Sequence, residues 1–244
     1  MIIQYIIIML NFDTFINERY REIKKDKSNY FTKVVKISKI ELEEICEKMN
    51  LDYSSIKFLS SGRYGNAYKL NENYVLKITT DKNEAKSVYN LIKDKPLKSV
   101  VRYYDVAMYK LKNNSESGSS KYVYAILMDY VVPLSVYIKK IKNMDYEEYI
   151  NSITDILWKH WGKIEDISKF EELIEENFEI SSTGFGRLIV DQFWNLYNNL
   201  KSKKRLDIHI FNLGFRKKDL VLFDYSDVGT KSFVRKFDNP RILN

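Results

Sequence analysis

Three oxygen-bearing side chains late in the chain have the types and spacing that phosphate chemistry needs. Asp207 and Asn212 lie five positions apart, and Asp224 directly follows the apolar run 220–223. A carboxylate can accept the proton of an attacking hydroxyl, and carboxylate and amide oxygens are ligands that suit Mg²⁺. Alone, each residue is an ordinary turn former. Together they predict phosphoryl transfer, with Asp207 as the base and Asn212 and Asp224 as the metal ligands.

A glycine pair upstream is placed to hold phosphates. Gly62 and Gly65 lie between two predicted strands, residues 57–61 and 66–70. Glycine lets the backbone approach phosphate oxygens closely, so that main-chain N–H groups can face an anion. A plain hairpin is the alternative. The strand that follows favours the phosphate loop, because it carries a lysine.

Lys77 lies on that strand, predicted over residues 74–78. Side chains alternate along a strand, so Val75 and Lys77 share one face. Val75 and Ala67 could then cover an adenine while Lys77 reaches the phosphates. A lysine on the exposed face of an edge strand is the alternative. If the ammonium is buried it needs an anion, because burial without one costs several kcal/mol.

Glu84 is the expected partner of Lys77. It lies in the first turn of a helix predicted over residues 81–92, with Asp81 as the N-cap. Glu72 and Asp81 are also near in sequence, and a surface glutamate is favoured in a first helical turn by the helix dipole. We expect a Lys77–Glu84 ion pair.

Met128 ends a strand predicted over residues 122–128. In a two-lobed protein, residues 129–133 would link the lobes, their backbone would pair with an adenine edge, and Met128 would border the pocket. An ordinary strand end, with Pro133 interrupting the ladder, explains the same residues without a ligand.

The surrounding pattern predicts an α+β fold. Residues 1–50 are expected to form an N-terminal helical extension, with Leu42, Ile45, Cys46 and Met49 on one stripe. Residues 51–130 read as a small antiparallel β lobe with one helix, including a strand over 100–111. Residues 131–244 read as a reduced, mainly helical lobe with a hairpin between Asn212 and Asp224.

Composition limits the remaining possibilities. The 244 residues contain one cysteine, Cys46, which excludes an internal disulfide and suits a reducing compartment. The formal charge of +7 fits a nucleotide partner, but scattered lysines also serve solubility. No module typical of nucleic-acid binding is present, so that partner is not expected. The apolar run 1–10 is too short for a bilayer span, which needs about 20 residues. We therefore expect a cytoplasmic protein without a membrane partner.

The combined pattern resembles the protein-kinase-like superfamily over about residues 56–228. The residues that carry the resemblance are Gly62, Gly65, Lys77, Glu84, Asp207, Asn212 and Asp224. The Asp-x-His-x-x-Asn form of the loop is similar to bacterial and bacteriophage kinase-like proteins and to aminoglycoside phosphotransferases. The compact glycine loop resembles the early serine/threonine kinases of T7-like phages. The resemblance implies a bilobal fold, ATP and Mg²⁺ as cofactors, and a phage or bacterial source.

Departures from the family pattern leave the acceptor open. Arg205 and Leu206 precede Asp207 where a His-Arg pair is usual, and Tyr225 and Ser226 replace Phe-Gly after Asp224. No Ala-Pro-Glu segment follows. We expect a serine/threonine protein kinase that can act on itself. The alternatives are an aminoglycoside-type small-molecule phosphotransferase and a pseudokinase that acts as a binding module.

Two histidines complete the candidates. His209 lies within the predicted catalytic loop, where it could approach the transferred phosphate or only stabilise the loop. His160 lies in an aromatic helical segment and is expected to be structural.

Overall fold

The computed structural model describes the chain in segments, all within one compact unit, Val34–Asn244. The described residues are 37–62, 64–93, 96–112, 122–138, 146–176, 184–203, 206, 208–225 and 241–243. Asp207, the predicted base, lies outside them, as do the apolar run 1–10 and residues 11–36 of the helical stretch expected over residues 11–50.

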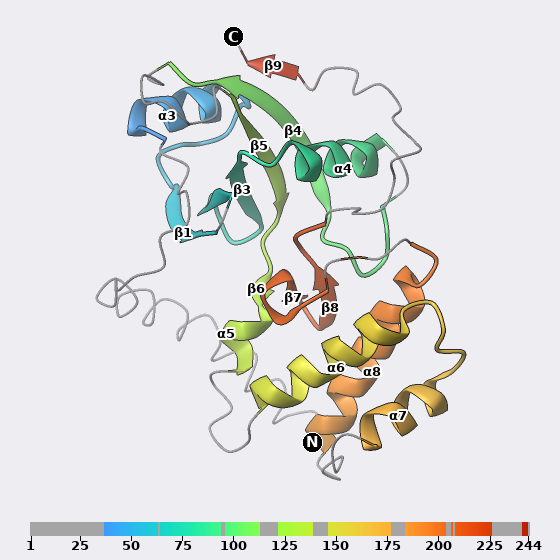
Figure 1. Cartoon of the computed structure of the whole chain (residues 1–244). Helices are drawn as coiled ribbons and strands as arrows, with labels where there is room; N and C mark the ends of the chain where they lie inside the picture. Colours follow the sequence, from blue (N-terminus) through green and yellow to red (C-terminus); the bar gives the residue numbers. More distant parts are fainter. Residues whose placement is uncertain are drawn as a thin grey trace. The chain divides into compact units, whose positions relative to one another are not determined.

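A six-stranded sheet forms one part of this unit (Figure 1). Its strands are β1 (Lys57–Ser61), β2 (Gly65–Lys69), β3 (Tyr74–Thr79), β4 (Tyr103–Lys110), β5 (Tyr122–Asp129) and β9 (Arg241–Leu243). Their order is β1-β2-β3-β5-β4-β9, and every neighbouring pair is antiparallel except β4 and β9. The predicted α+β class, with an antiparallel sheet and several helices, is confirmed.

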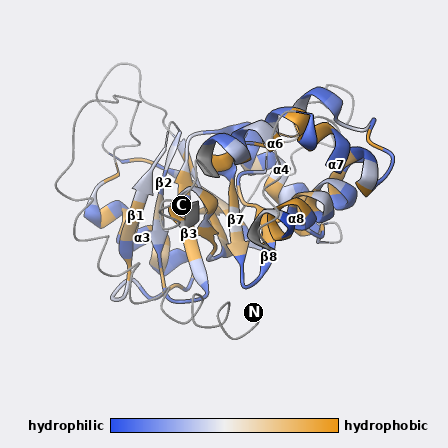
Figure 2. Cartoon of the chain, turned by 90° about the horizontal axis from the view of Figure 1, so that it is seen from below, coloured by the Kyte–Doolittle hydropathy of each residue, from blue (hydrophilic) through white to orange (hydrophobic). Residues whose placement is uncertain are grey.

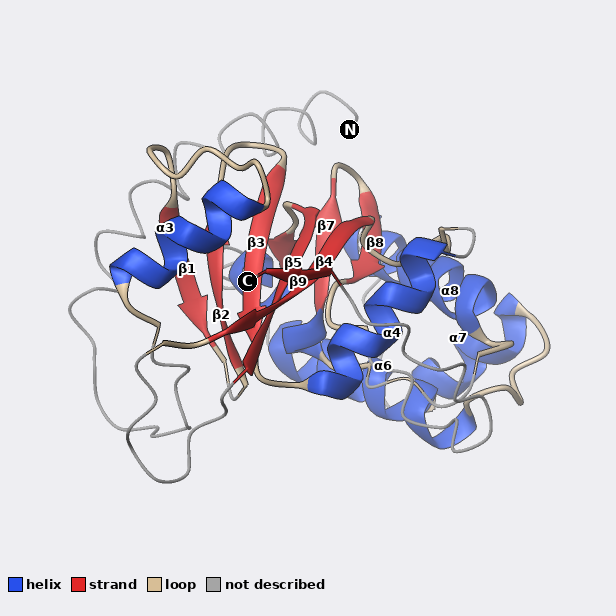
Figure 3. Cartoon of the chain, turned by 90° about the horizontal axis from the view of Figure 1, so that it is seen from above, coloured by secondary structure: helices blue, strands red, loops and turns tan. Residues whose placement is uncertain are grey.

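Helix α3 (Lys39–Lys48) covers one face of this sheet (Figure 3). Ser38 caps its first turn in a reciprocal capping box with Glu41, which satisfies backbone donors that a helix start leaves unpaired. The predicted apolar stripe is confirmed, because Leu42, Ile45, Cys46 and Met49 are all buried against the sheet.

Helix α4 (Lys82–Lys93) packs on the opposite face through Ala85 and Val88. The Asp81 carboxylate accepts hydrogen bonds from the N–H groups of Asn83, at 2.8 Å, and Glu84, at 3.2 Å. Asp81 is therefore the N-cap of α4, as predicted. The cap fixes the first helical turn, and with it the position of Glu84.

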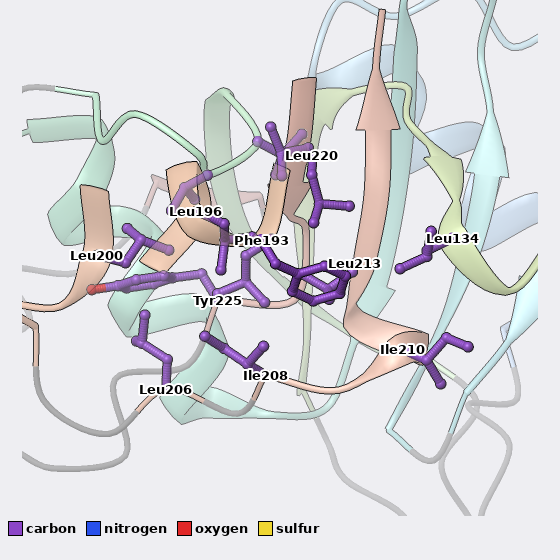
Figure 4. Close-up of a cluster of buried hydrophobic side chains, with 14 of the residues drawn as sticks. Leu134, Phe193, Leu196, Leu200, Leu206, Ile208, Ile210, Leu213, Leu220 and Tyr225 are labelled. Carbon is purple, nitrogen blue, oxygen red and sulfur yellow. The ribbon is translucent and has the colours of Figure 1, made fainter. Parts of the chain in front are cut away.

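The second part of the unit is mainly helical. It contains α5 (Leu134–Ile138), α6 (Tyr146–His160), α7 (Ile167–Glu175) and α8 (Gly184–Leu200). A short 3₁₀ helix, η1 (Ile210–Asn212), leads into a small sheet of β6 (Val132–Pro133), β7 (Leu213–Arg216) and β8 (Asp219–Leu222). Apolar residues gather where α8 lies beside β8 (Figure 2). Figure 4 shows Phe193 of α8 in this core, close to Leu213 of β7.

The hairpin predicted between Asn212 and Asp224 is present as β7 and β8, joined by a turn in which Lys217 has φ 58°. Within the described residues, no helix has the length and apolar character needed to cross a bilayer. The domain limits at residues 50 and 130 remain predictions.

Two features of the sheet differ from the sequence prediction. Strand β4 begins at Tyr103 instead of residue 100, because Ser99 has φ 61° and Val100 forms a parallel bridge with Leu222 instead. Strand β9 was not predicted. It joins the six-stranded sheet beside β4, although its residues follow the helical part in sequence.

Candidate active site

A largely buried lysine between two carboxylates forms the centre of the candidate site. The Nζ atom of Lys77 lies 2.5 Å from Glu84 Oε1 and 3.2 Å from Asp224 Oδ2. The side chains of Lys77 and Glu84 are 18% and 4% exposed, whereas that of Asp224 is 36% exposed. The cluster is therefore closed on the Glu84 side and open to solvent on the Asp224 side.

The structure distinguishes between the acids that lie near Lys77 in sequence. Glu72 binds Lys69 at 2.7 Å on the surface, and Asp81 is occupied as the cap of α4. Glu84 contacts Lys77 because β3 and the capped first turn of α4 bring the two side chains together. The alternative of an exposed Lys77 is excluded by its burial.

Two carboxylates share one ammonium, which leaves the cluster with a net charge of −1. Burial raises the pKa of Glu84 to about 7, and the Asp224 carboxylate adds to the rise, while Lys77 opposes it. For Lys77 itself, burial is the largest single influence and lowers its pKa, but the two carboxylates together raise the pKa above its ordinary value. The lysine therefore remains charged at neutral pH, and Glu84 carries the excess proton as the pH falls.

This arrangement predicts a pH-dependent contribution of Glu84 to folding. A carboxyl whose pKa is about 7 when folded and 4.5 when free binds its proton more tightly in the folded protein. The resulting stabilisation is fully present below pH 4.5 and is lost as the pH rises through 7. It amounts to roughly 3 kcal/mol at most, at about 1.4 kcal/mol for each pKa unit.

Urea unfolding of the wild type and Glu84→Gln at pH 5 and pH 8 checks this prediction. We expect the stability of the wild type relative to Glu84→Gln to be greater at pH 5 than at pH 8. Glu43→Gln, an exposed change on α3, serves as the control and should give no such difference. A pH-independent difference for Glu84→Gln would contradict the raised pKa.

The glycine loop is closed by a hydrogen bond from the Gly62 N–H to the Gly65 carbonyl at 2.7 Å. A Cβ atom on Gly65 would lie 2.4 Å from the carbonyl oxygen of Ile78, so any side chain there would force β2 and β3 apart. A Cβ on Gly62 would meet no heavy atom closer than 3.9 Å. Gly65 is thus required by the close approach of β3, whereas Gly62 borders open space.

The residues expected to contact adenine lie on the face of the sheet that carries Lys77. Ala67 is opposite Lys77 across β2 and β3, and Val75 is opposite Met128 across β3 and β5. Val75 and Met128 are buried in the same apolar cluster, and Ala67 packs against it. The structure therefore brings these three side chains together with Lys77.

A backbone hydrogen bond joins one expected metal ligand, Asn212, to the residue next to the other, Asp224. The N–H of Phe223, the residue before Asp224, donates to the Asn212 carbonyl at 2.9 Å. Asn212 is buried and Asp224 is partly open. An amide and a carboxylate oxygen are a donor pair that fits Mg²⁺. No group of three or more His, Cys, Asp or Glu side chains suited to a metal occurs in the described part of the chain.

His209 has a structural role in the loop. Its Nδ1 atom accepts a hydrogen bond from the Phe211 N–H at 3.2 Å and caps η1. His160 is at the end of α6, away from the contacts of Lys77. Of the two readings of His209, the structure supports loop stabilisation.

One contact of the site was not predicted from the sequence. Asp224 was expected only as a metal ligand, yet it also pairs with Lys77. The sequence did contain a signal for this contact, because Lys77 and Asp224 were both predicted to lie around the same phosphates. Nothing in the sequence, however, fixes the distance between these two side chains.

No protein-family model and no curated protein sequence matches the chain. Solved structures match at low similarity. The streptomycin–ATP–APH(2″)-IIa ternary complex shares 17% identity over 79% of this chain and 73% of its own, with a TM-score of 0.29. A thermostable mutant of aminoglycoside phosphotransferase APH(4)-Ia, in its apo form, shares 11% over 76% and 71%, with a TM-score of 0.37. ADP-bound aminoglycoside phosphotransferase APH(2″)-Ib shares 15% over 78% and 73%, with a TM-score of 0.32. Similarity at this level does not identify an activity.

Proposed function

We propose that this protein is an ATP-dependent phosphotransferase that acts on an alcohol group. The largely buried Lys77 between Glu84 and Asp224, beside a glycine loop, is the observation that carries the proposal. A lysine held in this way by two carboxylates on a largely apolar strand is suited to bind phosphate oxygens, because its ammonium is already oriented and mostly shielded from water.

The proposed roles follow from the positions of the side chains. Lys77 binds the phosphates, and Glu84 holds the lysine in place. Asn212 and Asp224 hold Mg²⁺, which would shield the phosphate charge. Gly62 and Gly65 allow backbone N–H groups to approach the phosphates, and the adenine lies against the apolar residues of the sheet, Ala67, Val75 and Met128.

Asp207 is proposed as the base of the transfer step. The hydroxyl oxygen of the acceptor forms a bond to the γ-phosphorus while the bond from that phosphorus to the β–γ bridging oxygen breaks. The hydroxyl proton passes to the Asp207 carboxylate, and ADP leaves. Atoms and charges balance in this step without any further reactant.

Two classes of phosphate acceptor are compatible with this proposal, a small-molecule alcohol and a protein hydroxyl. The matching solved structures named above are aminoglycoside phosphotransferases, and a small-molecule alcohol is accordingly the first acceptor to test. The protein serine/threonine acceptor expected from the sequence has no support among the described residues. It remains the second candidate, because compact phage kinases share the loop pattern.

Transfer of label from γ-labelled ATP tests the proposal. The full chain is incubated with Mg²⁺ and, separately, with a panel of aminoglycosides, with a generic protein acceptor and alone. We expect label on an acceptor with the wild type and none above background with Asp207→Asn. Label on an aminoglycoside identifies a small-molecule enzyme, and label on protein identifies a protein kinase. Nucleotide binding without transfer to any acceptor would replace the proposal with the pseudokinase alternative.

A further inference from the structure

The backbone before Asp224 is hydrogen-bonded to the segment that leads into β4. The Leu222 N–H donates to the Ser99 carbonyl and the Val101 N–H donates to the Leu222 carbonyl, each at 2.9 Å. The Ser99 hydroxyl in turn accepts from the Asn199 side chain of α8 at 2.9 Å. The segment before Asp224 is therefore tied both to the six-stranded sheet and to the helical part.

Tyr103, the first residue of β4, continues this arrangement past Asp224. Its hydroxyl donates to the Phe223 carbonyl at 3.0 Å and accepts from the Tyr225 N–H at 3.3 Å. These two backbone groups are those of the residues immediately before and after Asp224. Burial, and after it the nearby carboxylates of Glu84 and Asp224, raise the pKa of Tyr103 well above its ordinary value. The hydroxyl therefore keeps its proton and can serve as the donor to Phe223.

A bulge in β4 aims Tyr103 at this position. Ala107 and Tyr109 face the α3 side of the sheet, whereas Val106 belongs to the core on the α4 side. Regular alternation would place Tyr103 with Ala107 and Tyr109. A register shift between Tyr103 and Asp105 places it with Val106 instead. Bulges occur often beside functional sites, where they redirect a side chain.

We propose that Tyr103 is a positioning residue that sets the direction of the Asp224 carboxylate by fixing the backbone on both sides of it. The inference rests on the proposed function, in which Asp224 holds the metal. The ring of Tyr225 is buried in the helical core with Leu206 and Ile208 (Figure 4), which anchors the far side of Asp224. Displacement of the backbone that carries the carboxylate then requires breaking both hydrogen bonds of the Tyr103 hydroxyl.

Tyr103→Phe removes only this hydroxyl, and Tyr109→Phe is a matched control. Tyr109 lies on the same strand and is also buried, but its hydroxyl donates to Glu44 at 2.5 Å on the α3 side. The probe is Mn²⁺, which shares the oxygen ligands of Mg²⁺, in the presence of a saturating non-hydrolysable ATP analogue. Free Mn²⁺ is measured by electron paramagnetic resonance.

We expect Tyr103→Phe to bind Mn²⁺ at least about tenfold more weakly than the wild type, the range typical of residues that orient a metal ligand. Tyr109→Phe should bind as the wild type does. Affinity for the analogue without metal should stay unchanged in both variants. Wild-type Mn²⁺ affinity in Tyr103→Phe overturns the inference. An equal loss of metal-free nucleotide affinity also overturns it, because the hydroxyl would then have a general structural role.

Two further measurements keep the outcome decisive. If Tyr103→Phe does not fold, hydrogen exchange of the Tyr225 amide is measured in the wild-type protein instead. Protection of this amide supports the inference. Exchange at the rate of an unstructured peptide overturns it. Failure of the proposed function is separate. A wild type without phosphotransfer but with a Tyr103-dependent Mn²⁺ site would remove the proposed reaction and retain the positioning role.

Discussion

Asp224→Ala is expected to lower the rate of phosphate transfer at least about a thousandfold, which corresponds to about 4 kcal/mol in the barrier. The change removes the charged oxygen ligand proposed for Mg²⁺ and one of the two carboxylates beside Lys77. The Lys77–Glu84 pair remains, so that nucleotide binding without metal should persist. Loss of rate with retained metal-free binding is the expected combination, measured by label transfer and by titration with an ATP analogue.

Asp219→Ala is the matched control for this variant. Asp219 is an exposed aspartate at the start of β8 in the same hairpin, so its loss removes an equal charge without touching the site. Its rate should stay within about twofold of the wild type, as for most surface changes away from a site. If Asp224→Ala kept more than about a tenth of the wild-type rate, the metal-binding role of Asp224 would be wrong.

Phe193→Ala is expected to lower the free energy of unfolding by about 3–5 kcal/mol. The Phe193 side chain is fully buried on α8, and its loss leaves a cavity beneath β7 and β8. The same hairpin leads directly into Asp224, and Gln192 of α8 accepts a hydrogen bond from the Leu220 N–H at 3.0 Å. The cost is a large share of the stability of a typical domain, which is about 5–15 kcal/mol.

Urea unfolding followed by circular dichroism measures this loss, with Phe211→Ala as the control. Phe211 is the same residue type but 63% exposed on η1. Its removal should cost less than about 1 kcal/mol, because little apolar surface returns to water. Equal losses in the two variants would show that α8 does not hold the hairpin through its apolar contacts.

The Lys77–Glu84 contact shows how far sequence reasoning reaches. A lysine among apolar strand residues implies a buried charge, and a buried charge requires a counter-ion. The N-cap at Asp81 sets where α4 begins, so Glu84 falls in its first turn. Each step uses local rules, and the pairing follows from them together with the antiparallel order of the strands.

Tyr103 and β9 show where such reasoning stops. The side of the sheet to which Tyr103 points depends on a bulge in β4. The alternating pattern of apolar residues in the sequence gives little indication of such a bulge. Its hydroxyl acts on Phe223, 120 positions away. Likewise, the pairing of Arg241 with Ala107 depends on tertiary folding that no local pattern contains. The position of Asp224 against Lys77 likewise depends on tertiary folding, because it requires the segment after β8 to reach the side chain of β3.

The parallel pairing of β9 with β4 has a consequence for the kinetics of folding. Strand β4 forms its antiparallel ladder with β5, its neighbour in sequence, through contacts of short range. Its other edge is closed by β9, and that contact requires a long loop to close first, which slows folding. Until it forms, β4 presents an open row of backbone donors and acceptors that another chain can pair with. Refolding yield should therefore fall as protein concentration rises, with this edge as the point of self-association.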